Sequence, residues 1–476
     1  MDDIKVVRAP FVGRERELAT LTSMLEEVHR SGTGLLLTIR GRRRVGKSRL
    51  VDEWCKRQGL HHVFYESTRA RQTGVELAQF AQEAANSSLA AAPTFAGVTP
   101  QSWEAAFNLI ASQSTPAEPS VVVLDEFPYL FQAEPNIDAV LQRIWDRAID
   151  KKAAVLIILI GSDLHMMEQL GHYDRPLYGR AREQIVDPLS PADVADMTGL
   201  TGADALDAYL VCGGFPMLAE RWQSGESFWR YLQHELTPTS PLIVNAERML
   251  AAEFPSEAQA RAILEVIGSG ETTFNNVSKS AGINHAGVTR ALEVLVQKRA
   301  IEIMRPASID RAAKNTRYSI ADSYLRFWLR FIGPAIGEIE RGHADLVFSS
   351  IERDWNQYRG HAVEPVVREA VRRLHPPTGR ASYVGAYWTR TNDVQVDLVG
   401  VGKERDNVQI EFVGSIKWRD SARFDASDVA ALARDRLKVP GATESTPMVG
   451  VSRSGFDEVK SLARKLDDAD IVAAFK

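Results

Sequence analysis

The sequence predicts an α/β fold whose N-terminal part is a doubly wound parallel sheet, and three apolar runs predict it. The first, 35–40, leads directly into a glycine-rich segment, 41–48, after which apolar residues recur at helical spacing. The second, 121–124, ends in two carboxylates, and the third, 154–160, ends in Gly-Ser-Asp. Helical patterns separate the runs. Each run is therefore expected to be a buried parallel strand with polar residues at the carboxyl edge of the sheet.

The glycine-rich segment is Gly41-Arg-Arg-Arg-Val-Gly46-Lys47-Ser48, with the spacing G-x-x-x-x-G-K-S between a strand and a helix. Glycine lets backbone N–H groups close around phosphate oxygens, and the helix N-terminus adds partial positive charge. Lys47 is expected to reach the β- and γ-phosphates, and the Ser48 hydroxyl to ligate Mg²⁺. ATP and Mg²⁺ are therefore the expected cofactors. The residues expected to contact the nucleotide here are Gly41, Arg42, Arg43, Arg44, Val45, Gly46, Lys47, Ser48 and Arg49.

A Gly13-Arg14-Glu15 turn precedes the first helical pattern. Such a turn can place backbone against an adenine ring, and on this interpretation Gly13 and Arg14 join the nucleotide-contacting set. It can equally well cap the helix that follows, because Glu15 and Glu17 in a first turn favour the helix dipole. The sequence leaves both interpretations open.

The polar residues that follow the second and third runs have distinct expected roles. Asp125 is expected to hold the Mg²⁺ shell, and Glu126 to polarise the attacking water. The alternative for this pair is capping of the next helix. Ser162 is expected to hydrogen-bond the γ-phosphate or the water, against the alternative of an ordinary loop serine.

An arginine supplied in cis or by a neighbouring subunit stabilises transferred phosphate charge. Arg180, at the end of Pro176-Leu-Tyr-Gly-Arg180, is the first candidate and Arg182 is the second. Surface arginines are common, so a structural role for both stays open. A homo-oligomer is expected if the arginine acts in trans.

These motifs, together with Gly213-Gly214-Phe-Pro216, resemble the archaeal-type ATPase family, which is similar to AAA+ and STAND NTPases. The resemblance covers nearly the whole chain. It implies that Lys47, Glu126, Ser162 and Arg180 act in ATP hydrolysis, and that the Gly-Gly turn begins a lid helix. The implied domains are an AAA+-like P-loop ATPase domain (1–188), a helical lid (189–250), a winged helix-turn-helix domain (251–335) and a PD-(D/E)XK nuclease-like domain (336–476).

The middle of the chain has the order of a winged helix. Helical patterns over 258–268, 274–281 and 285–298 precede two short strand patterns, 301–304 and 318–320. Residues 258–317 contain nine Lys/Arg and five Asp/Glu, a local charge of +4 in a chain whose formal net charge is −5. Two roles for this segment stay open: contact with DNA, and packing between the ATPase domain and the C-terminal domain. The residues expected to contact DNA phosphates are Lys279, Arg290, Arg311 and Lys314.

The resemblance implies a nuclease-like C-terminal core in which a helix glutamate, a strand aspartate and a Glu-x-Lys pair hold Mg²⁺. Glu364, Asp397 and Lys417 fit this pattern, whereas Gln395 and Ser415 stand where acids are usual. A neutral serine is a poor Mg²⁺ ligand. Glu411 lies about 13 Å along the strand from that position at ~3.3 Å per residue. A degenerate fold retained for binding or assembly is therefore expected over an active nuclease.

Composition limits the class of protein. With 45% hydrophobic and 25% charged residues, the 476-residue chain has the composition of a soluble globular protein. Two cysteines give neither metal spacing nor a disulfide framework, and no apolar run approaches about 18 residues, so a cytoplasmic protein without membrane contact is expected. The predicted function is an ATP-driven switch that acts on a protein partner or on DNA. An ATP-gated DNA nuclease and a nucleotide-dependent transcription regulator are the alternatives.

Overall fold

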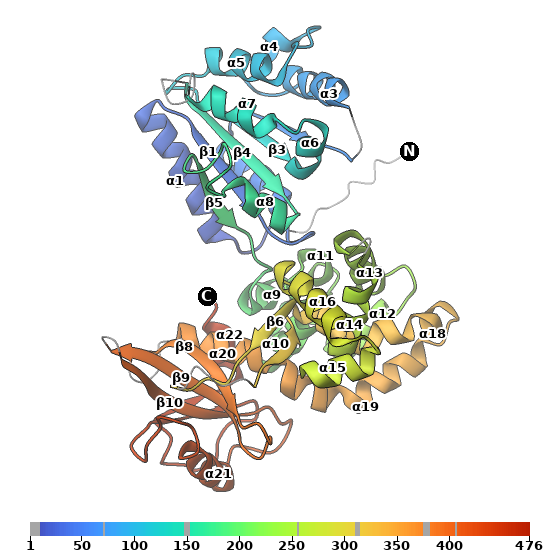
Figure 1. Ribbon diagram of the computed structural model, residues 1–476, viewed down its shortest axis with the longest axis vertical. Helices are drawn as coiled ribbons and strands as arrows, with labels where there is room; N and C mark the ends of the chain where they lie inside the picture. The colour runs from blue at the N-terminus through green and yellow to red at the C-terminus, as the bar shows by residue number, and fades with distance from the viewer. Residues whose placement is uncertain are drawn as a thin grey trace. The chain divides into compact units, whose positions relative to one another are not determined.

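The computed structural model describes residues 10–69, 72–146, 153–254, 257–309, 315–374, 381–404 and 407–476 (Figure 1). The chain divides into two compact units, of which the first ends at Pro188 and the second begins at Leu189. Two residues expected to contact DNA, Arg311 and Lys314, lie outside the described residues. Among the described residues, none of the helices combines the length and the apolar character needed to cross a bilayer.

Unit 1 is built on one five-stranded sheet with the strand order β2-β3-β4-β1-β5, and all neighbouring strands run parallel. The predicted parallel α/β sheet is confirmed, and the first predicted strand has the expected bounds. The elements are α1 (Glu15–Ser31), β1 (Leu35–Arg40), α2 (Lys47–Gln58), β2 (His62–Glu66), α3 (Thr73–Ala85), α4 (Ala92–Phe95), α5 (Trp103–Gln113), β3 (Ser120–Asp125), α6 (Phe127–Ala133), α7 (Ile137–Ile144), β4 (Val155–Gly161), α8 (Leu164–Leu170) and β5 (Ala181–Ile185).

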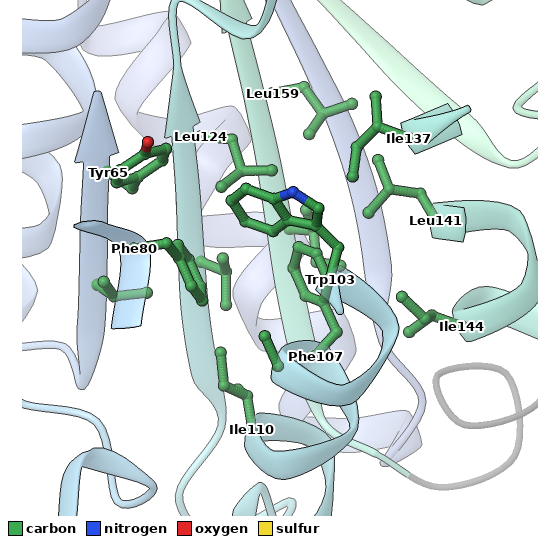
Figure 2. Close-up of a cluster of buried hydrophobic side chains, with 14 of the residues drawn as sticks. Tyr65, Phe80, Trp103, Phe107, Ile110, Leu124, Ile137, Leu141, Ile144 and Leu159 are labelled. Carbon is green, nitrogen blue, oxygen red and sulfur yellow. The ribbon is translucent and has the colours of Figure 1, made fainter. Parts of the chain in front are cut away.

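One face of this sheet is covered by aromatic and aliphatic side chains from α3, α5 and α7 (Figure 2). The Trp103 ring lies at the centre, 5.1 Å from the Phe80 ring and 6.1 Å from the Tyr65 ring, measured between centroids. Tilted rings at these distances are a favourable arrangement, and each buries a large apolar area. Leu124 of β3 and Leu159 of β4 are fully buried beneath this layer. The core therefore holds in place the two strands whose tips end in the predicted polar residues.

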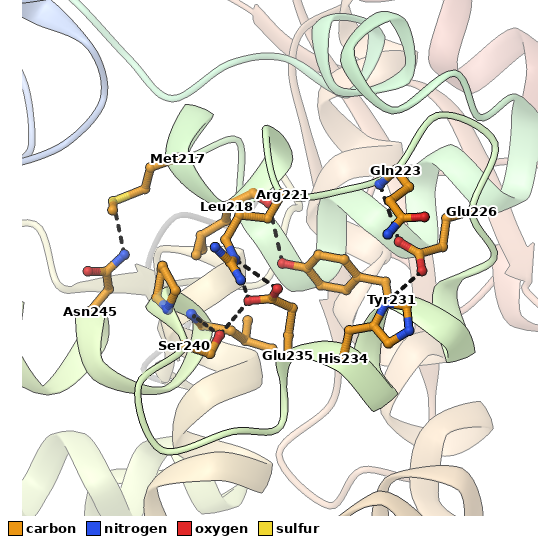
Figure 3. A network of polar contacts seen from close by, with 12 residues as sticks. Met217, Leu218, Arg221, Gln223, Glu226, Tyr231, His234, Glu235, Ser240 and Asn245 are labelled. Carbon is orange, nitrogen blue, oxygen red and sulfur yellow. Dashed lines mark hydrogen bonds and ion pairs between the residues drawn. The ribbon is translucent and has the colours of Figure 1, made fainter. Parts of the chain in front are cut away.

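Unit 2 begins with a group of helices that encloses a buried polar network (Figure 3). The Glu235 carboxylate is buried and accepts hydrogen bonds from the Arg221 guanidinium, at 2.7 Å, and from the Ser240 hydroxyl. Nearby, the Tyr231 ring stacks on Trp222 with 3.8 Å between centroids. A buried carboxylate is costly without hydrogen-bond partners, so the helices have to keep Arg221 and Ser240 beside Glu235. The helices are α9 (Pro191–Thr198), α10 (Gly202–Cys212), α11 (Pro216–Ala219), α12 (Phe228–Glu235) and α13 (Pro241–Glu253).

The middle of unit 2 has three helices followed by a two-stranded antiparallel hairpin, in the order that the sequence predicts. The segment after the hairpin is rich in aromatic residues and belongs to the core, since Tyr324, Phe327, Trp328 and Phe331 are all buried. The elements are α14 (Ala258–Ser269), α15 (Phe274–Ala281), α16 (His285–Gln297), β6 (Ile301–Met304), β7 (Arg317–Ile320), α17 (Ser323–Phe327), the π-helical turn η2 (Trp328–Ile332), η3 (Gly333–Ala335), α18 (Ile336–Glu340), α19 (Ala344–Ala362) and α20 (Glu364–Arg373).

The C-terminal part of unit 2 is a five-stranded mixed sheet with the order β12-β11-β10-β9-β8. Strands β8, β9 and β10 are antiparallel, whereas β10, β11 and β12 are parallel. A bulge between Ile410 and Phe412 interrupts the alternation of faces along β10. Regular alternation along a strand would place Glu411 and Ser415 on one face, and the bulge makes that assignment wrong. The elements are β8 (Ala381–Trp388), β9 (Gln395–Glu404), β10 (Asn407–Lys417), α21 (Ala426–Arg436), β11 (Met448–Ser452), β12 (Arg464–Leu466) and α22 (Asp468–Ala473).

Candidate nucleotide-binding site

The glycine-rich loop joins β1 to α2 at the carboxyl edge of the unit 1 sheet. Because β3, β4 and β1 are neighbours in the sheet, the tips of the three predicted strands lie side by side. Gly41 is fitted closely, since a Cβ there would lie 2.2 Å from the Val186 carbonyl oxygen. Gly46 has φ 93° and precedes the first residue of α2. Both glycines are therefore required by the backbone path that the loop takes.

The Lys47 side chain lies inside the loop. Its Nζ donates hydrogen bonds to the carbonyl oxygens of Gly41, at 2.8 Å, and Arg42, at 2.9 Å. Burial lowers the pKa of this amine to about 8, while the carboxylates of Glu126 and Asp125 act in the opposite direction. The first turn of α2 contains no acidic residue, and its cap has no side chain to occupy the N–H groups. The loop and the helix start thus present donors and positive charge to the same space.

Asp125 ends β3 and is almost completely buried. Its carboxylate accepts a hydrogen bond from the Ser48 hydroxyl and another from the Glu126 backbone N–H, at 2.8 Å. Burial raises the pKa of Asp125 to about 6, and the nearby carboxylates of Glu126 and Glu66 add to the rise. The structure therefore brings together the hydroxyl and the carboxylate that the sequence assigns to Mg²⁺.

Glu126 has an unusual backbone and a defined side-chain partner. Its φ of 48° and ψ of 44° lie in the left-handed region, which costs free energy for a residue with a Cβ. Ser162, just beyond β4, donates its hydroxyl to the Glu126 carboxylate oxygens at 3.2 and 3.1 Å. Glu126 and Ser162, to which the sequence assigns separate roles, are thus in direct contact.

The turn before α1 also contacts the loop. Arg14 has φ 68° and donates through one guanidinium nitrogen to the Val45 carbonyl oxygen at 3.0 Å. Arg43 donates to the Tyr129 hydroxyl at 2.7 Å, which connects the loop to α6. Sequence reasoning missed Tyr129, for which no local pattern exists. It also missed Glu66, although this carboxylate ends β2 in the same way as Asp125 ends β3.

The two candidate arginines are held by carboxylates outside the glycine-rich loop. Arg180 pairs with Asp146, with nitrogen–oxygen distances of 3.0 and 3.3 Å. Arg182 pairs with Glu27 of α1, at 2.8 and 2.6 Å. Each pair is partly exposed. Neither contact places an arginine against Lys47 or Glu126.

The nuclease-like residues are only partly brought together. Arg368 lies between Glu364 and Asp397, since its guanidinium donates to the Glu364 carboxylate and, at 3.1 Å, to the Asp397 backbone carbonyl. The Asp397 carboxylate accepts from the Ser415 hydroxyl at 3.1 Å. Lys417 instead pairs with Asp428 of α21, at 3.6 Å. Within the part of the chain that the structure describes, no three His, Cys, Asp or Glu side chains are grouped so that they could hold a metal ion.

Comparison with known families separates the two parts of the chain. Residues 11–218 match the family described as an ATPase domain predominantly from Archaea. The N-terminal part of the chain is an archaeal ATPase domain. Residues 328–429, downstream of this ATPase domain, match a second family, described as archaeal and bacterial proteins of unknown function. The resemblance that the motifs indicate is thereby confirmed.

Individual relatives are distant. The chain is 27% identical over 432 residues to an uncharacterised protein of Methanocaldococcus jannaschii, covering 89% of this chain and 90% of that protein. Among solved structures, a Walker-type ATPase of Pyrococcus abyssi is 21% identical, with a TM-score of 0.49 over 67% of this chain and 96% of that chain. The ORC2 protein of Aeropyrum pernix is 12% identical, with a TM-score of 0.42 over 73% of this chain and 97% of that chain.

Proposed function

We propose that the protein is an ATP-hydrolysing switch, in which Mg-ATP turnover in the ATPase domain changes the state of the C-terminal regions. The observation that carries this proposal is the convergence of one lysine and two side-chain pairs at one sheet edge. Lys47 lies within the glycine-rich loop, Ser48 contacts Asp125, and Ser162 contacts Glu126. This is the set of groups that phosphoryl transfer to water requires.

The residues present fit ATP and Mg²⁺. The close approach at Gly41 and the donors around Lys47 suit phosphate oxygens. Ser48 and Asp125 would hold Mg²⁺, which in such sites uses one or two carboxylates together with substrate phosphates. When bound, Mg²⁺ neutralises charge that develops on the phosphates.

In the proposed reaction, water attacks the γ-phosphorus, the bond to the β–γ bridging oxygen breaks, and ADP and phosphate leave. The Glu126 carboxylate accepts a hydrogen bond from this water and so orients the water oxygen for attack. Ser162 holds the Glu126 carboxylate in position for this task. Lys47 contributes positive charge next to the transferred group, and Arg180 is proposed to add charge from its own or a neighbouring subunit.

We propose that 251–335 is a winged helix that serves mainly as a packing module. The order of α14, α15, α16 and the β6–β7 hairpin supports this assignment. Two contacts tie the segment around the hairpin to β8: Ala307 N–H donates to the Ala386 carbonyl at 2.7 Å, and Arg317 lies over the Trp388 ring at 4.5 Å. A hairpin engaged in this way is occupied within its own chain. DNA contact, if it occurs, falls to exposed residues of the helices such as Arg290.

We further propose that 336–476 is a degenerate nuclease fold used for assembly or binding. The order α20, β8, β9, β10, α21, β11 supports the fold assignment. A guanidinium between Glu364 and Asp397 supports the loss of a metal site, because it places a cation beside both residues. The bulged Glu411 contacts Gln409 rather than Asp397, so it does not replace the acid missing at Ser415.

The proposal is tested by steady-state ATP hydrolysis with purified full-length protein. Lys47→Ala is expected to abolish turnover, and Glu126→Gln to retain bound ATP without hydrolysing it. Lys56→Ala is the matched control, since Lys56 is an exposed lysine of the same helix that pairs with Asp52. Full ATPase activity in Lys47→Ala would show that the site is misassigned. Plasmid cleavage with Mg²⁺ or Mn²⁺ that Asp397→Ala abolishes would restore the ATP-gated nuclease as the better function.

A further inference from the structure

Unit 2 contains a cleft that the proposed ATPase reaction does not use. Its volume is about 460 Å³, and it lies between the end of α14, the β6–β7 hairpin, α17, α19 and α20. A cavity of this size is within the range that binds small molecules. The residues that carry the argument are Arg317, Ser319, Arg326, Arg330 and Tyr358, all of which line the cleft.

Three arginines of the cleft are held by neutral acceptors. Arg317 donates to the side-chain oxygen of Asn392 at 2.7 Å, and Arg326 donates to the backbone carbonyls of Ala362 and Ile320. Arg330 donates to the Ser269 carbonyl at 3.2 Å. A carbonyl uses one or two of the five N–H donors of a guanidinium and leaves its charge uncompensated. Burial lowers the pKa of Arg317, while the Glu364 carboxylate acts in the opposite direction.

The two acids in the cleft wall already have cationic partners. Glu364 contacts Arg368 and, at 3.2 Å, His361. Asp354 pairs with Arg353 at 3.0 Å. Glu364 also acts on Arg317, and Asp354 on Arg330, but the lining holds four arginines, these three and Arg368, against two carboxylates. The cleft is therefore electropositive, which favours an anion with several oxygen acceptors. Phosphate is such a group, and planar guanidinium groups bind it in bidentate geometry.

Two hydroxyls in the wall of the cleft are buried without a hydrogen-bond partner in the described structure: Ser319 Oγ and Tyr358 Oη. Buried polar groups are nearly always satisfied, because an unsatisfied one costs about 1–3 kcal/mol. Both lie in the same cleft as the arginines, and the Ser319 hydroxyl can turn about a single bond. A ligand with acceptor atoms would satisfy them.

The cleft is also lined by apolar residues. These are Ile267, Met304, Ile320 and Pro365. An inorganic anion would gain nothing from these residues, whereas a flat heterocycle would bury apolar surface against them. The cleft thus suits a ligand that carries both a phosphate and an aromatic ring.

From this arrangement we infer that the cleft is a second ligand site, distinct from the glycine-rich loop, that binds a nucleoside monophosphate. The phosphate contacts Arg317, Arg326 and Arg330, and the base packs against the apolar residues of the lining. The hydroxyls of Ser319 and Tyr358 complete the contacts to phosphate or sugar. The inference does not depend on ATP hydrolysis at Lys47.

The experiment uses the full-length chain carrying Lys47→Ala, so that the glycine-rich loop does not contribute to nucleotide binding. AMP, GMP, CMP and UMP are each titrated by calorimetry, followed by inorganic phosphate, the free nucleoside and a single-stranded oligonucleotide. At least one monophosphate is expected to bind saturably with one site per chain. Its nucleoside and inorganic phosphate are expected to bind at least about tenfold more weakly, because each makes only part of the contacts.

Two variants in this background separate recognition from folding. Arg330→Gln is expected to weaken monophosphate binding about tenfold, and Tyr358→Phe several-fold. Tyr358→Phe removes only a hydroxyl without a partner, so the ligand-free melting temperature should stay the same or rise. Tyr231→Phe is the matched control: its hydroxyl donates to the Leu218 carbonyl outside the cleft, so it should lower the melting temperature without changing affinity.

Three results would overturn the inference. In the first, none of the four monophosphates saturates the chain by about 10 mM. In the second, binding occurs but Arg330→Gln and Tyr358→Phe both leave affinity unchanged. In the third, only the oligonucleotide binds, which would make the cleft part of a nucleic-acid surface. Loss of ATPase activity in Lys47→Ala has no bearing on any of these outcomes.

Discussion

Ser162 donates its hydroxyl to the Glu126 carboxylate at 3.2 and 3.1 Å, across a sequence separation of 36 residues. The serine follows β4 and the glutamate follows β3, and these strands are neighbours in the sheet. The Glu126 backbone is in the left-handed region, so its side chain leaves the strand tip in a direction that an extended residue would not give. The contact indicates that Ser162 positions the glutamate, in addition to any contact it makes with phosphate.

Ser162→Ala is therefore expected to lower kcat for ATP hydrolysis by about tenfold, the value of one hydrogen bond to a charged group. The dissociation constant for ATP should stay within about twofold, because the loop residues that bind phosphate are untouched. Ser162→Thr keeps the hydroxyl and should recover part of the rate. Single-turnover hydrolysis and equilibrium nucleotide binding measure the two quantities. Weaker ATP binding with an unchanged rate would instead assign Ser162 to ground-state phosphate contact.

The raised pKa of Asp125 predicts how the stability of the nucleotide-free protein depends on pH. Its pKa is about 6 in the folded chain against an ordinary value of 3.8, so the ionised carboxylate is disfavoured by folding. The protonated Asp125 carboxyl therefore contributes its full free energy to stability below about pH 4, and this contribution is lost as the pH rises through about 6. Asp125→Asn should therefore stabilise unit 1 by the order of 1–3 kcal/mol at pH 8 and have little effect at pH 4.

Thermal unfolding of the nucleotide-free protein at a series of pH values measures this difference. Asp163→Asn serves as the control, since Asp163 caps α8 near the same sheet edge and is exposed. A constant difference between Asp125→Asn and wild type from pH 4 to pH 8 would contradict the assignment of a buried, hard-to-ionise carboxylate.

The sequence predicts the strands and their tips well because the local pattern is complete. The run 35–40 coincides with β1, and Asp125 is the last residue of β3, as the apolar-to-acid transition indicates. Glycines at fixed positions and a lysine at the helix start follow from the chemistry of phosphate binding. These features depend on residues that are adjacent in the chain.

Features that depend on strand order or backbone irregularity could not be predicted. The contact of Ser162 with Glu126 requires β4 to lie beside β3, which no local pattern specifies. The bulge at Glu411 interrupts the alternation of side chains between the two faces of β10, although the sequence pattern of this strand is regular. The arginine between Glu364 and Asp397 comes from α20, so its position depends on how a helix packs on the sheet.

Arg180 and Arg182 are a matched pair for testing whether an arginine stabilises the charge on the transferred phosphoryl group. Both are partly exposed and each is held by one carboxylate, Asp146 or Glu27. If Arg180 supplies positive charge to the transition state, Arg180→Ala should lower kcat by about 10³-fold, whereas Arg182→Ala should leave it unchanged. Asp146→Asn, which releases Arg180, should maintain or raise the rate. ATP turnover measured over a range of protein concentrations checks whether the arginine acts between subunits.

Wild-type activity in both alanine variants would assign a structural role to both arginines. A loss in Arg182→Ala alone would exchange the roles assigned to them. A rate per chain that rises with protein concentration, and a loss in Arg180→Ala that an equal amount of Glu126→Gln protein rescues, would place the arginine in trans.

A buried ion cluster in unit 2 gives the last prediction. Arg359 of α19 and Arg453 both contact one carboxylate oxygen of Asp207 in α10, each at 3.2 Å, and Arg359 also contacts Asp420. Arg359→Leu should destabilise unit 2 by about 3 kcal/mol, because Asp207 is buried and loses half of its compensation. Arg353→Leu, on the same helix but exposed, should be nearly neutral. Thermal unfolding and hydrogen exchange in α10 measure the effect. Asp207→Asn in the Arg359→Leu background should recover part of the loss, and equal stability of the two single variants would show that the cluster does not hold α10 to α19.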